Sequence, residues 1–179
     1  MTVAGLMIFA VSACASSPST APSMADDQSS GQEMEASGEE AAARQQALEE
    51  QQRKEEADHR QYEIERNRFV YEDIYFAKNK YRLSEQAVRE LEWKTEWLQN
   101  HPAVKVLIEG YCDEGGSAQD NLALGARRAG EVESFFLRRG IARERLSSIS
   151  YGKERPIAVG NTEEVRAKNR RVRTLITAE

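Results

Sequence analysis

The most constraining feature of this 179-residue chain is a change in amino-acid composition and apolar patterning near Phe69. Large apolar side chains are sparse between the first eleven positions and Phe69, and they recur with regular spacing after it. Residues 1–68 carry 6 Lys and Arg against 13 Asp and Glu, whereas residues 69–179 carry 19 against 17. A domain of about 110 residues can bury a sufficient core. We therefore expect one folded domain, residues 69–179, behind an acidic extension, and its balanced charge argues against a dedicated nucleic-acid binder.

The N-terminus has the pattern of a bacterial export signal. Residues 3–11 form an apolar run that is too short to cross a bilayer as a helix, and small residues follow it up to Cys14. This arrangement is typical of a secretory signal, and its small-small-Cys ending resembles the lipobox of bacterial lipoproteins. That resemblance implies a signal peptide of residues 1–13 and an acylated Cys14, since two or three acyl chains anchor a protein stably. The alternative is an ordinary hydrophobic N-terminus that contains a cysteine by chance.

The residues on either side of this segment refine the expectation. Met1 and Thr2 include no Lys or Arg, although export signals begin with a basic region, so we expect the true start to lie upstream. The residue after Cys14 is Ala15 rather than Asp. By the sorting rule of bacterial lipoproteins, this favours the outer membrane.

Two segments of different composition connect Cys14 to the expected domain. Residues 14–38 are rich in Ser, Ala, Pro, Gly and acidic residues, and a segment of this kind cannot bury enough apolar surface to offset its ordering entropy. Residues 39–68 consist mainly of strong helix formers and contain no Gly or Pro. Leu48 is nearly the only large apolar residue before Tyr62, so a coiled coil is disfavoured. We expect a disordered tether followed by a solvated helical spacer.

In the C-terminal part, apolar periodicity predicts four strands alternating with three helices. Val104–Tyr111 is nearly continuous in apolar residues, as in a strand that is covered on both faces. Ser84 is placed to cap a helix, Gly140 to end one, and Asn161 with Glu164 fits a capping box. The β-α-β-α-β-α-β order predicts an α/β sandwich (α+β) in which two long helices cover one sheet. The strands are expected at 69–76, 104–111, 146–151 and 171–177, and the helices at 84–100, 120–139 and 161–169.

Opposite charges are expected at one rim of this sheet. Asp113 comes directly after the second strand, and a Gly-Gly-Ser turn leads from it into the helix that carries Arg127 and Arg128. A guanidinium binds a carboxylate through two parallel hydrogen bonds, and a carboxylate accepts hydrogen bonds from an ammonium group. Such a rim suits a zwitterionic ligand that carries both an amine and a carboxylate.

Four sequence blocks stand out in this region. They are Gly110-Tyr111-Cys112-Asp113, the Asn-x-x-Leu-x-x-Arg-Arg-Ala run of residues 121–129, residues 150–156, and Asn169-Arg170-Arg171-Val172. These blocks resemble those of the OmpA-like C-terminal domain family, and most closely its peptidoglycan-associated lipoproteins, and the resemblance extends over residues 71–176. It implies helices packed on a mixed four-stranded sheet, and a domain that binds the diaminopimelate-containing stem peptide of peptidoglycan.

By the same resemblance, Asp113 receives the ammonium group of the ligand and Arg128 receives a carboxylate. Loss of either side chain is expected to abolish wall binding without unfolding the domain. A helix-start cap is the alternative role for Asn121, and a structural or rim-lining role is the alternative for Arg170 and Arg171. The other residues expected in the ligand site are Phe76, Asn79, Tyr111, Asn121 and Arg171.

The chain departs from the family pattern after the first expected strand. It reads Phe76-Ala77-Lys78-Asn79, where the family often has Phe-Asp-x-Asp or Phe-Asp-x-Asn. Ala77 therefore replaces an acidic residue, while Asn79 keeps a polar side chain that can reach the stem peptide. We expect the preference or affinity for the ligand to differ as a result.

The resemblance also implies where the protein acts and with what. It describes a lipoprotein on the periplasmic face of the outer membrane that anchors this membrane to the cell wall. It further implies partners of the TolB and TolA type in the Tol-Pal system of cell division and envelope integrity. The alternative is a general OmpA-like envelope lipoprotein without a link to Tol.

The sequence does not support an enzyme. Cys112 could serve as a nucleophile only with a base nearby, but His59 lies in the helical spacer and His101 precedes the second strand, at its opposite end. Paired carboxylates for glycoside cleavage are not evident. No Cys and His cluster has metal-ligand spacing, and no cofactor is expected.

Overall fold

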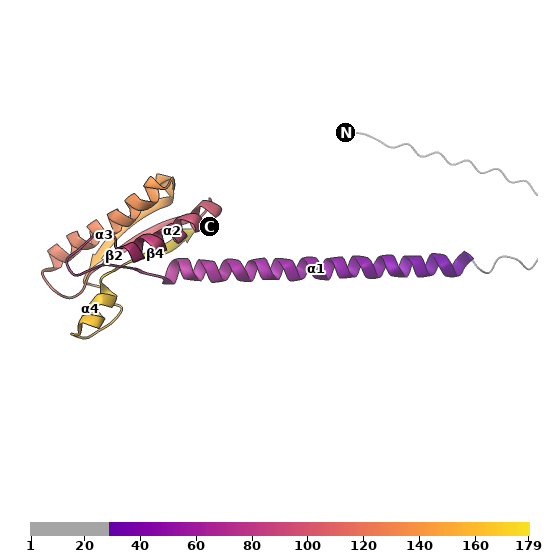
Figure 1. The fold of residues 1–179 in the computed structure, drawn as a ribbon, viewed down its shortest axis with the longest axis horizontal. Helices are drawn as coiled ribbons and strands as arrows, with labels where there is room; N and C mark the ends of the chain where they lie inside the picture. Colours follow the sequence, from indigo (N-terminus) through magenta and orange to yellow (C-terminus); the bar gives the residue numbers. More distant parts are fainter. Residues whose placement is uncertain (1–28) are drawn as a thin grey trace, which may run out of the picture. The chain divides into compact units, whose positions relative to one another are not determined.

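The structure is a computed structural model that describes residues 29–179, with side chains from residue 38 onward (Figure 1). The expected signal peptide 1–13, the acylated Cys14 and the first part of the expected tether lie outside the described residues. Residues 52–179 form the compact unit that contains the sheet and the candidate site.

The first helix, α1, is longer than the sequence predicts at both ends. It spans Ser29–Tyr71, so it begins upstream of the expected start at residue 39 and replaces the first residues of the expected strand 69–76. The last carbonyl groups of α1 are capped by side chains, because Phe69 O accepts hydrogen bonds from Lys94 Nζ and from Thr174 Oγ1. The Phe69 ring also lies 4.7 Å from the ring of Trp97. This packing overrides the strand propensity of residues 69–71 and corrects the prediction.

The remaining elements follow the expected order. The sheet has the strand order β1-β4-β2-β3, in which β2 and β3 are parallel and the other pairs antiparallel. This mixed four-stranded sheet confirms the predicted fold class. The elements are β1 (Ile74–Tyr75), α2 (Glu85–Asn100), β2 (Lys105–Tyr111), α3 (Ala118–Arg138), the 3₁₀ helix η1 (Arg143–Arg145), β3 (Leu146–Gly152), α4 (Glu163–Asn169) and β4 (Arg171–Ala178).

Local capping explains where the helices begin and end. Ser84 accepts a hydrogen bond from Ala87 N at 3.2 Å, as predicted for the start of α2. Gly140 follows α3 with a φ angle of 87°, a conformation that favours glycine. At α4 the capping residue is Thr162 rather than the predicted Asn161, because the Thr162 hydroxyl accepts from Val165 N.

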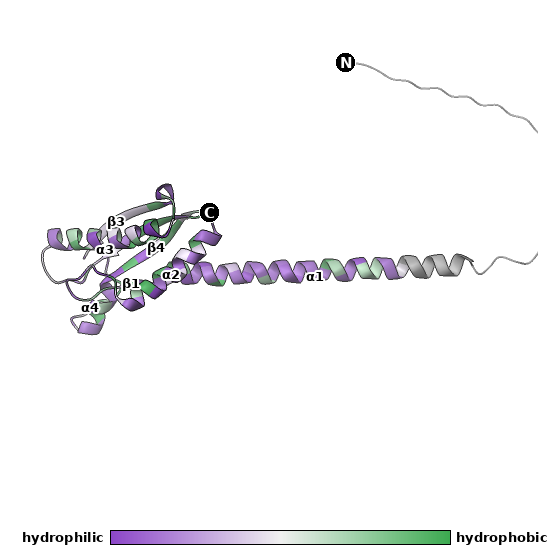
Figure 2. Cartoon of the chain, turned by 45° about the horizontal axis from the view of Figure 1, so that its top comes forward, coloured by the Kyte–Doolittle hydropathy of each residue, from purple (hydrophilic) through white to green (hydrophobic). Residues whose placement is uncertain are grey.

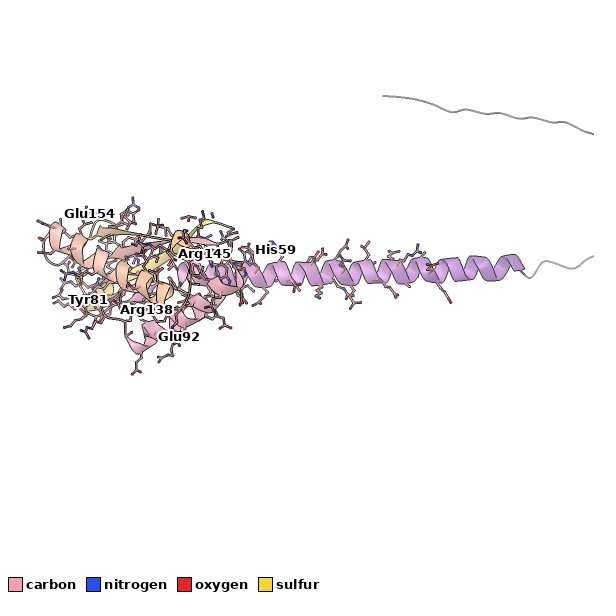
Figure 3. The ribbon with its side chains drawn as sticks, turned by 90° about the horizontal axis from the view of Figure 1, so that it is seen from above. His59, Tyr81, Glu92, Arg138, Arg145 and Glu154 are labelled. Carbon is pink, nitrogen blue, oxygen red and sulfur yellow. The ribbon has the colours of Figure 1, made fainter. Side chains whose placement is uncertain are left out.

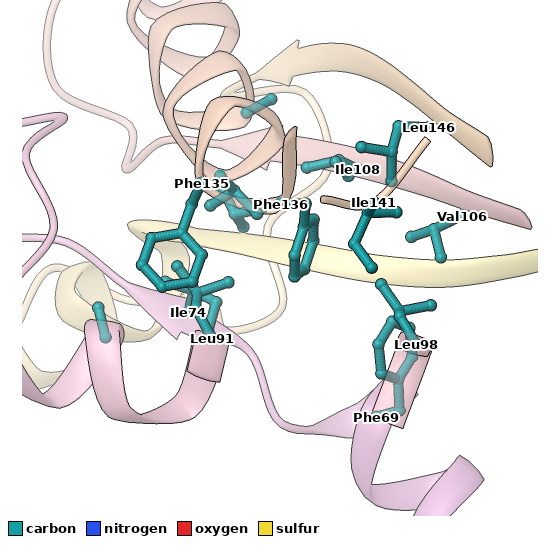
Figure 4. Close-up of a cluster of buried hydrophobic side chains, with 14 of the residues drawn as sticks. Phe69, Ile74, Leu91, Leu98, Val106, Ile108, Phe135, Phe136, Ile141 and Leu146 are labelled. Atoms are coloured by element: carbon teal, nitrogen blue, oxygen red, sulfur yellow. The ribbon is translucent and has the colours of Figure 1, made fainter. Parts of the chain in front are cut away.

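The helices α2 and α3 cover one face of the sheet. Alternate strand residues point toward these helices, so Ile108 of β2 and Val172 of β4 are both fully buried. Figure 4 shows Phe136 of α3 beside these core side chains. The buried core consists of Phe69, Ile74, Phe76, Ala87, Leu91, Trp97, Leu98, Val104, Val106, Ile108, Ala129, Val132, Phe135, Phe136, Ile141, Leu146 and Val172.

A buried lysine connects α1, α2 and β4. Lys94 is 0% exposed, its Nζ donates to Thr174 Oγ1 at 3.0 Å, and it lies 4.9 Å from the centre of the Phe69 ring. Burial, opposed by the nearby carboxylate of Glu90, lowers the pKa of Lys94 to about 8. A cation with a lowered pKa in the folded state destabilises the fold at low pH, because the unfolded chain binds the proton more tightly.

Stability is therefore expected to depend on pH through Lys94. Between about pH 8 and pH 10 the unfolded chain holds more protons at this side chain, so its contribution to the free energy of unfolding rises by about 1 kcal/mol per pH unit. Urea unfolding of the wild type and of Lys94→Met measures this contribution as the difference between their slopes. Equal slopes in the two proteins would show that Lys94 keeps an ordinary pKa in the folded state.

Candidate functional site

Hydrogen bonds within the turn, and from the first residues of α3 to the turn, fix the segment between β2 and α3. Gly115 N donates to Asp113 Oδ1 at 3.2 Å, and the Ser117 hydroxyl accepts from Asp120 N at 3.0 Å to cap α3. The amide group of Asn121 donates to Gly115 O at 2.6 Å and to Ser117 O at 3.0 Å. Asn121 is 4% exposed, so its amide holds the turn in shape and does not face solvent.

Asp113 is paired with an arginine that the sequence analysis placed outside the ligand site. Its Oδ2 accepts from Arg170 Nη1 at 3.1 Å, and the two side chains are 13% and 7% exposed. Arg170 also donates to Glu163 Oε1 at 2.7 Å and to Phe76 O at 3.2 Å. It therefore joins the start of β4 to α4, to the segment after β1 and to the turn after β2.

Arg128 points into the protein rather than outward. It is 0% exposed, and its guanidinium donates to Lys80 O at 2.9 Å, to Tyr111 O at 2.8 Å and to Ala77 O at 3.3 Å. In the described part of the chain no carboxylate lies within ion-pair distance of Arg128, although Asp113 is near enough to act on its pKa. Burial is the larger effect and lowers the pKa of Arg128. Arg128 is thus a buried cation whose partners are main-chain carbonyl groups.

The loop after β1 supplies two of these carbonyl groups. Lys80 N donates to Ala77 O at 3.0 Å, which closes a tight turn around Asn79. Asn79 is exposed and adopts a φ angle of 56°, a left-handed conformation that asparagine tolerates better than most residues. Phe76, at the start of the loop, is buried and lies 5.3 Å from the Arg128 guanidinium. The loop therefore covers Arg128, with Asn79 on its outer side.

Tyr111 and Arg171 lie mainly on the face of the sheet that turns away from the helices. The Tyr111 hydroxyl donates to Glu109, and the Arg171 guanidinium lies 3.9 Å from the centre of the Tyr111 ring. The ring of Tyr151 stacks on Tyr111 at 5.6 Å. Only the main-chain carbonyl of Tyr111 reaches Arg128. The structure thus brings Asp113, Arg128, Phe76 and Asn79 together, while Arg171 and the Tyr111 ring are buried on the other face of the sheet.

A small hollow opens beside Cys112 and Glu114, the two residues that flank Asp113 in the sequence. Its volume is about 260 Å³, and its lining includes Cys112, Glu114, Lys153 and Asn169. Glu114 is paired with Arg166 at 2.8 Å, and Lys153 Nζ donates to Gly116 O at 2.9 Å. Figure 3 shows Tyr81 and Glu154 at this end of the domain, away from Arg145. The Asp113 side chain itself does not line this hollow.

The surroundings of Cys112 and His101 fit packing roles rather than catalysis. The Cys112 thiol is 3% exposed and donates to Asn121 O at 3.3 Å, and burial raises its pKa. A raised thiol pKa disfavours the reactive thiolate. His101 ends α2, where its ring lies 4.3 Å from that of Trp97. Within residues 29–179 no group of His, Cys, Asp and Glu is arranged to hold a metal ion.

Comparison with known proteins identifies the family. The OmpA family profile matches residues 75–170, and the chain belongs to the OmpA family. Membership of this family agrees with the fold and with the expectation that the chain is not an enzyme. None of the helices in the described residues is long and apolar enough to cross a membrane.

The chain is similar to several proteins named peptidoglycan-associated lipoprotein. It is 39% identical over 101 residues to the one from Haemophilus influenzae, which covers 56% of this chain and 66% of that protein. The corresponding identity with the Pasteurella multocida protein is 36% over 110 residues, which cover 62% of this chain and 73% of that protein. The match spans 61% of the Brucella melitensis protein at 38% identity. The aligned region is thus just under two thirds of the Haemophilus and Brucella relatives.

Solved structures show the same fold. The crystal structure of the peptidoglycan-associated lipoprotein from Burkholderia pseudomallei superposes with a TM-score of 0.57 at 33% identity, and the match covers 59% of this chain and 89% of that one. The C-terminal domain of Helicobacter pylori MotB superposes with a TM-score of 0.57 at 24% identity, covering 60% and 85%. The second likeness concerns the fold alone.

Proposed function

We propose that the domain of residues 69–179 binds the stem peptide of peptidoglycan through diaminopimelate and holds the outer membrane to the cell wall. The observation that carries this proposal is the position of Arg128, a buried cation that has no carboxylate partner among the described residues and lies close to Asp113. A buried charge is costly unless it is paired. A carboxylate of the ligand would supply the missing partner, and the names of the relatives point to peptidoglycan as its source.

The loop after β1 must move for the ligand to reach Arg128. Arg128 Nε and Nη2 form the edge of the guanidinium that suits a carboxylate, and they now donate to Lys80 O and Ala77 O. A ligand carboxylate would replace these two carbonyl groups. The exposed Asn79 lies in the turn that has to shift, where it can contact the stem peptide. Ala77 supplies no carboxylate, so the ligand makes one contact fewer there than in family members that have an acidic residue at this position.

Asp113 provides the site for the ligand ammonium group. Each of its oxygens accepts one hydrogen bond in the structure, from Gly115 N and from Arg170. A carboxylate has about four acceptor positions, so an ammonium group can bind without displacing either donor. Arg170 holds Asp113 in place, and Asn121 holds the turn that precedes α3. We assign both residues a supporting role.

Asp113→Asn is expected to abolish retention of the protein on purified sacculi while the domain stays folded. Asparagine keeps the shape of the side chain but removes the charge that attracts the ammonium group, so affinity should fall about 30-fold or more. The measurement is co-sedimentation with sacculi, with and without free diaminopimelate as competitor, beside a urea unfolding curve.

Glu163→Gln is the matched control for this experiment. Glu163 is the other carboxylate that pairs with Arg170, but its side chain is 60% exposed. Its neutralisation should change retention little, because exposed ion pairs contribute little. A folded Asp113→Asn protein that still co-sediments with sacculi would contradict the proposed role of Asp113.

The lipid end and the Tol link complete the proposal. A signal peptide of residues 1–13, an acylated Cys14, a tether to residue 38 and a helical spacer at 39–68 would connect the domain to the outer membrane on its periplasmic side. A role in the Tol-Pal system is a further part of the proposal, and it rests on the resemblance to peptidoglycan-associated lipoproteins. Site-specific crosslinking to TolB-type or TolA-type proteins in cells distinguishes this role from that of a general OmpA-like envelope lipoprotein.

A further inference from the structure

A second hollow among the described residues lies apart from Asp113, on the other side of the loop after β1. It has a volume of about 460 Å³ and lies between β1, the end of α1 and the first turns of α2. Figure 2 shows β1 and the start of α2 close together. We call this hollow the β1–α2 groove. Its lining includes Arg68, Glu72, Tyr75, Lys80, Arg82 and Arg89.

The charged groups along the β1–α2 groove fall into a paired set and an unpaired set. Arg68 is paired with Glu90 at 3.0 Å and lies over the Trp93 ring at 3.9 Å. Asp73 is paired with arginines of β4, at 3.2 Å with Arg171 and 2.8 Å with Arg173. Both carboxylates of the paired set, Glu90 and Asp73, are therefore already bound by arginines.

The unpaired set is mostly positive. Lys80, Arg82 and Arg89 are exposed, and within the described residues none of them has a carboxylate partner. Glu72 is the opposing unpaired group, so three positive charges face one negative charge. The N-terminus of α2, which begins at Glu85, adds a partial positive charge from its free N–H groups. The groove therefore favours an anionic occupant.

The outer edge of β1 offers main-chain hydrogen-bonding groups to such an occupant. Phe76 N donates to Arg170 O on the β4 side, and main-chain groups of neighbouring residues in an antiparallel strand point in opposite directions. The N–H and C=O groups of Tyr75 therefore point away from β4, toward the open edge. Tyr75 is 48% exposed. An extended peptide can add to such an edge through main-chain hydrogen bonds.

We propose that the β1–α2 groove binds an extended, acidic segment of a partner protein. The segment pairs with the free edge of Tyr75 and places its carboxylates at Lys80, Arg82 and Arg89. This site adjoins the wall-binding site at the loop after β1 but uses neither Asp113 nor Arg128. The other open edge of the sheet, β3, serves as the internal comparison.

A synthetic peptide tests the proposal on the full chain. The probe is a capped, fluorescein-labelled peptide of alternating threonine and glutamate, and its affinity is measured by fluorescence anisotropy. The same peptide with lysine in place of glutamate should not bind. Added salt should weaken binding of the glutamate peptide, because the contacts are charged. In hydrogen exchange, the glutamate peptide should protect residues 72–82 and leave residues 146–152 unchanged.

Charge reversal identifies the residues involved. Arg82→Glu combined with Arg89→Glu should weaken the glutamate peptide by about tenfold or more. The matched control is Lys105→Glu combined with Arg138→Glu, which makes the same change in net charge at exposed positions outside the groove. The control pair should leave the affinity within about twofold.

The two proposed sites are distinguished in the same set of proteins. The groove variant should still co-sediment with sacculi, and Asp113→Asn should still bind the peptide. Equal binding of the lysine peptide, unchanged affinity in the groove variant, or protection along β3 would each overturn the proposal. Wall binding is tested by sacculus co-sedimentation of Asp113→Asn, and the peptide-binding results do not bear on it.

Discussion

Arg128→Ala is expected to lower the free energy of unfolding by about 3–5 kcal/mol, because it removes a large buried side chain and takes one donor away from each of three carbonyl groups. Those carbonyl groups belong to Ala77, Lys80 and Tyr111, so the change releases the loop after β1 from the end of β2. Retention on sacculi should be lost as well. Urea unfolding and co-sedimentation, measured on the same preparation, check both effects.

Arg127→Ala is the matched control for this prediction. Arg127 is the preceding residue of α3 and is exposed. Its removal should change the free energy of unfolding by less than about 0.5 kcal/mol. Arg128→Lys keeps the charge but offers a single donor group in place of the planar fork, so it should lie between wild type and Arg128→Ala in stability. An Arg128→Ala protein as stable as the Arg127→Ala protein would contradict the structural role of Arg128.

This prediction replaces the simpler one that the sequence suggests. The spacing between Asp113 and Arg128 places both at one end of the sheet, and the structure agrees with that placement. Spacing alone does not fix where a side chain points, however, and Arg128 turns inward to the carbonyl groups of a loop far away in the sequence. A binding defect in Arg128→Ala therefore does not by itself identify a ligand contact. Asp113→Asn is the cleaner test.

The partner of Asp113 illustrates the same limit. Arg170 and Arg171 are consecutive, so their side chains leave the start of β4 in opposite directions. Arg170 reaches Asp113, while Arg171 reaches Asp73 and the Tyr111 ring. From the sequence we expect Arg171, but not Arg170, among the residues of the ligand site. The direction of each side chain depends on the register of β4, which a single sequence does not show.

The sequence predicts the fold better than it predicts the site. The apolar spacing of α2, α3, β2, β3 and β4 reflects burial against one core, and such periodicity is visible in a single sequence. The first strand was the exception, because Phe69 is buried at the end of α1 and its carbonyl group is capped by Lys94 and Thr174. Those two residues come from distant elements. Local propensity therefore gave the wrong element there.

Gly110→Ala is expected to destabilise the domain by about 3 kcal/mol or more, at or beyond the upper end of the usual cost of overpacking a core. Gly110 lies in β2, where α3 crosses the sheet at Gly125. A Cβ atom on Gly110 would lie 2.0 Å from Gly125 O and 2.7 Å from Gly125 C. Both are main-chain atoms of a helix, so no side chain can rotate away to make room. The helix would have to move off the strand.

Gly130→Ala, one helix turn further along α3, is the opposite case. A Cβ atom there would meet nothing within 4 Å. Alanine is the better helix former, so this change should stabilise the domain by about 0.5–1 kcal/mol. Urea unfolding of the two variants compares the same chemical change in one domain. Because α3 carries Arg128 and begins at the turn next to Asp113, Gly110→Ala should also weaken retention on sacculi, whereas Gly130→Ala should not. If both variants unfolded at the wild-type urea concentration, the close crossing at Gly110 and Gly125 would not be what holds α3 in place.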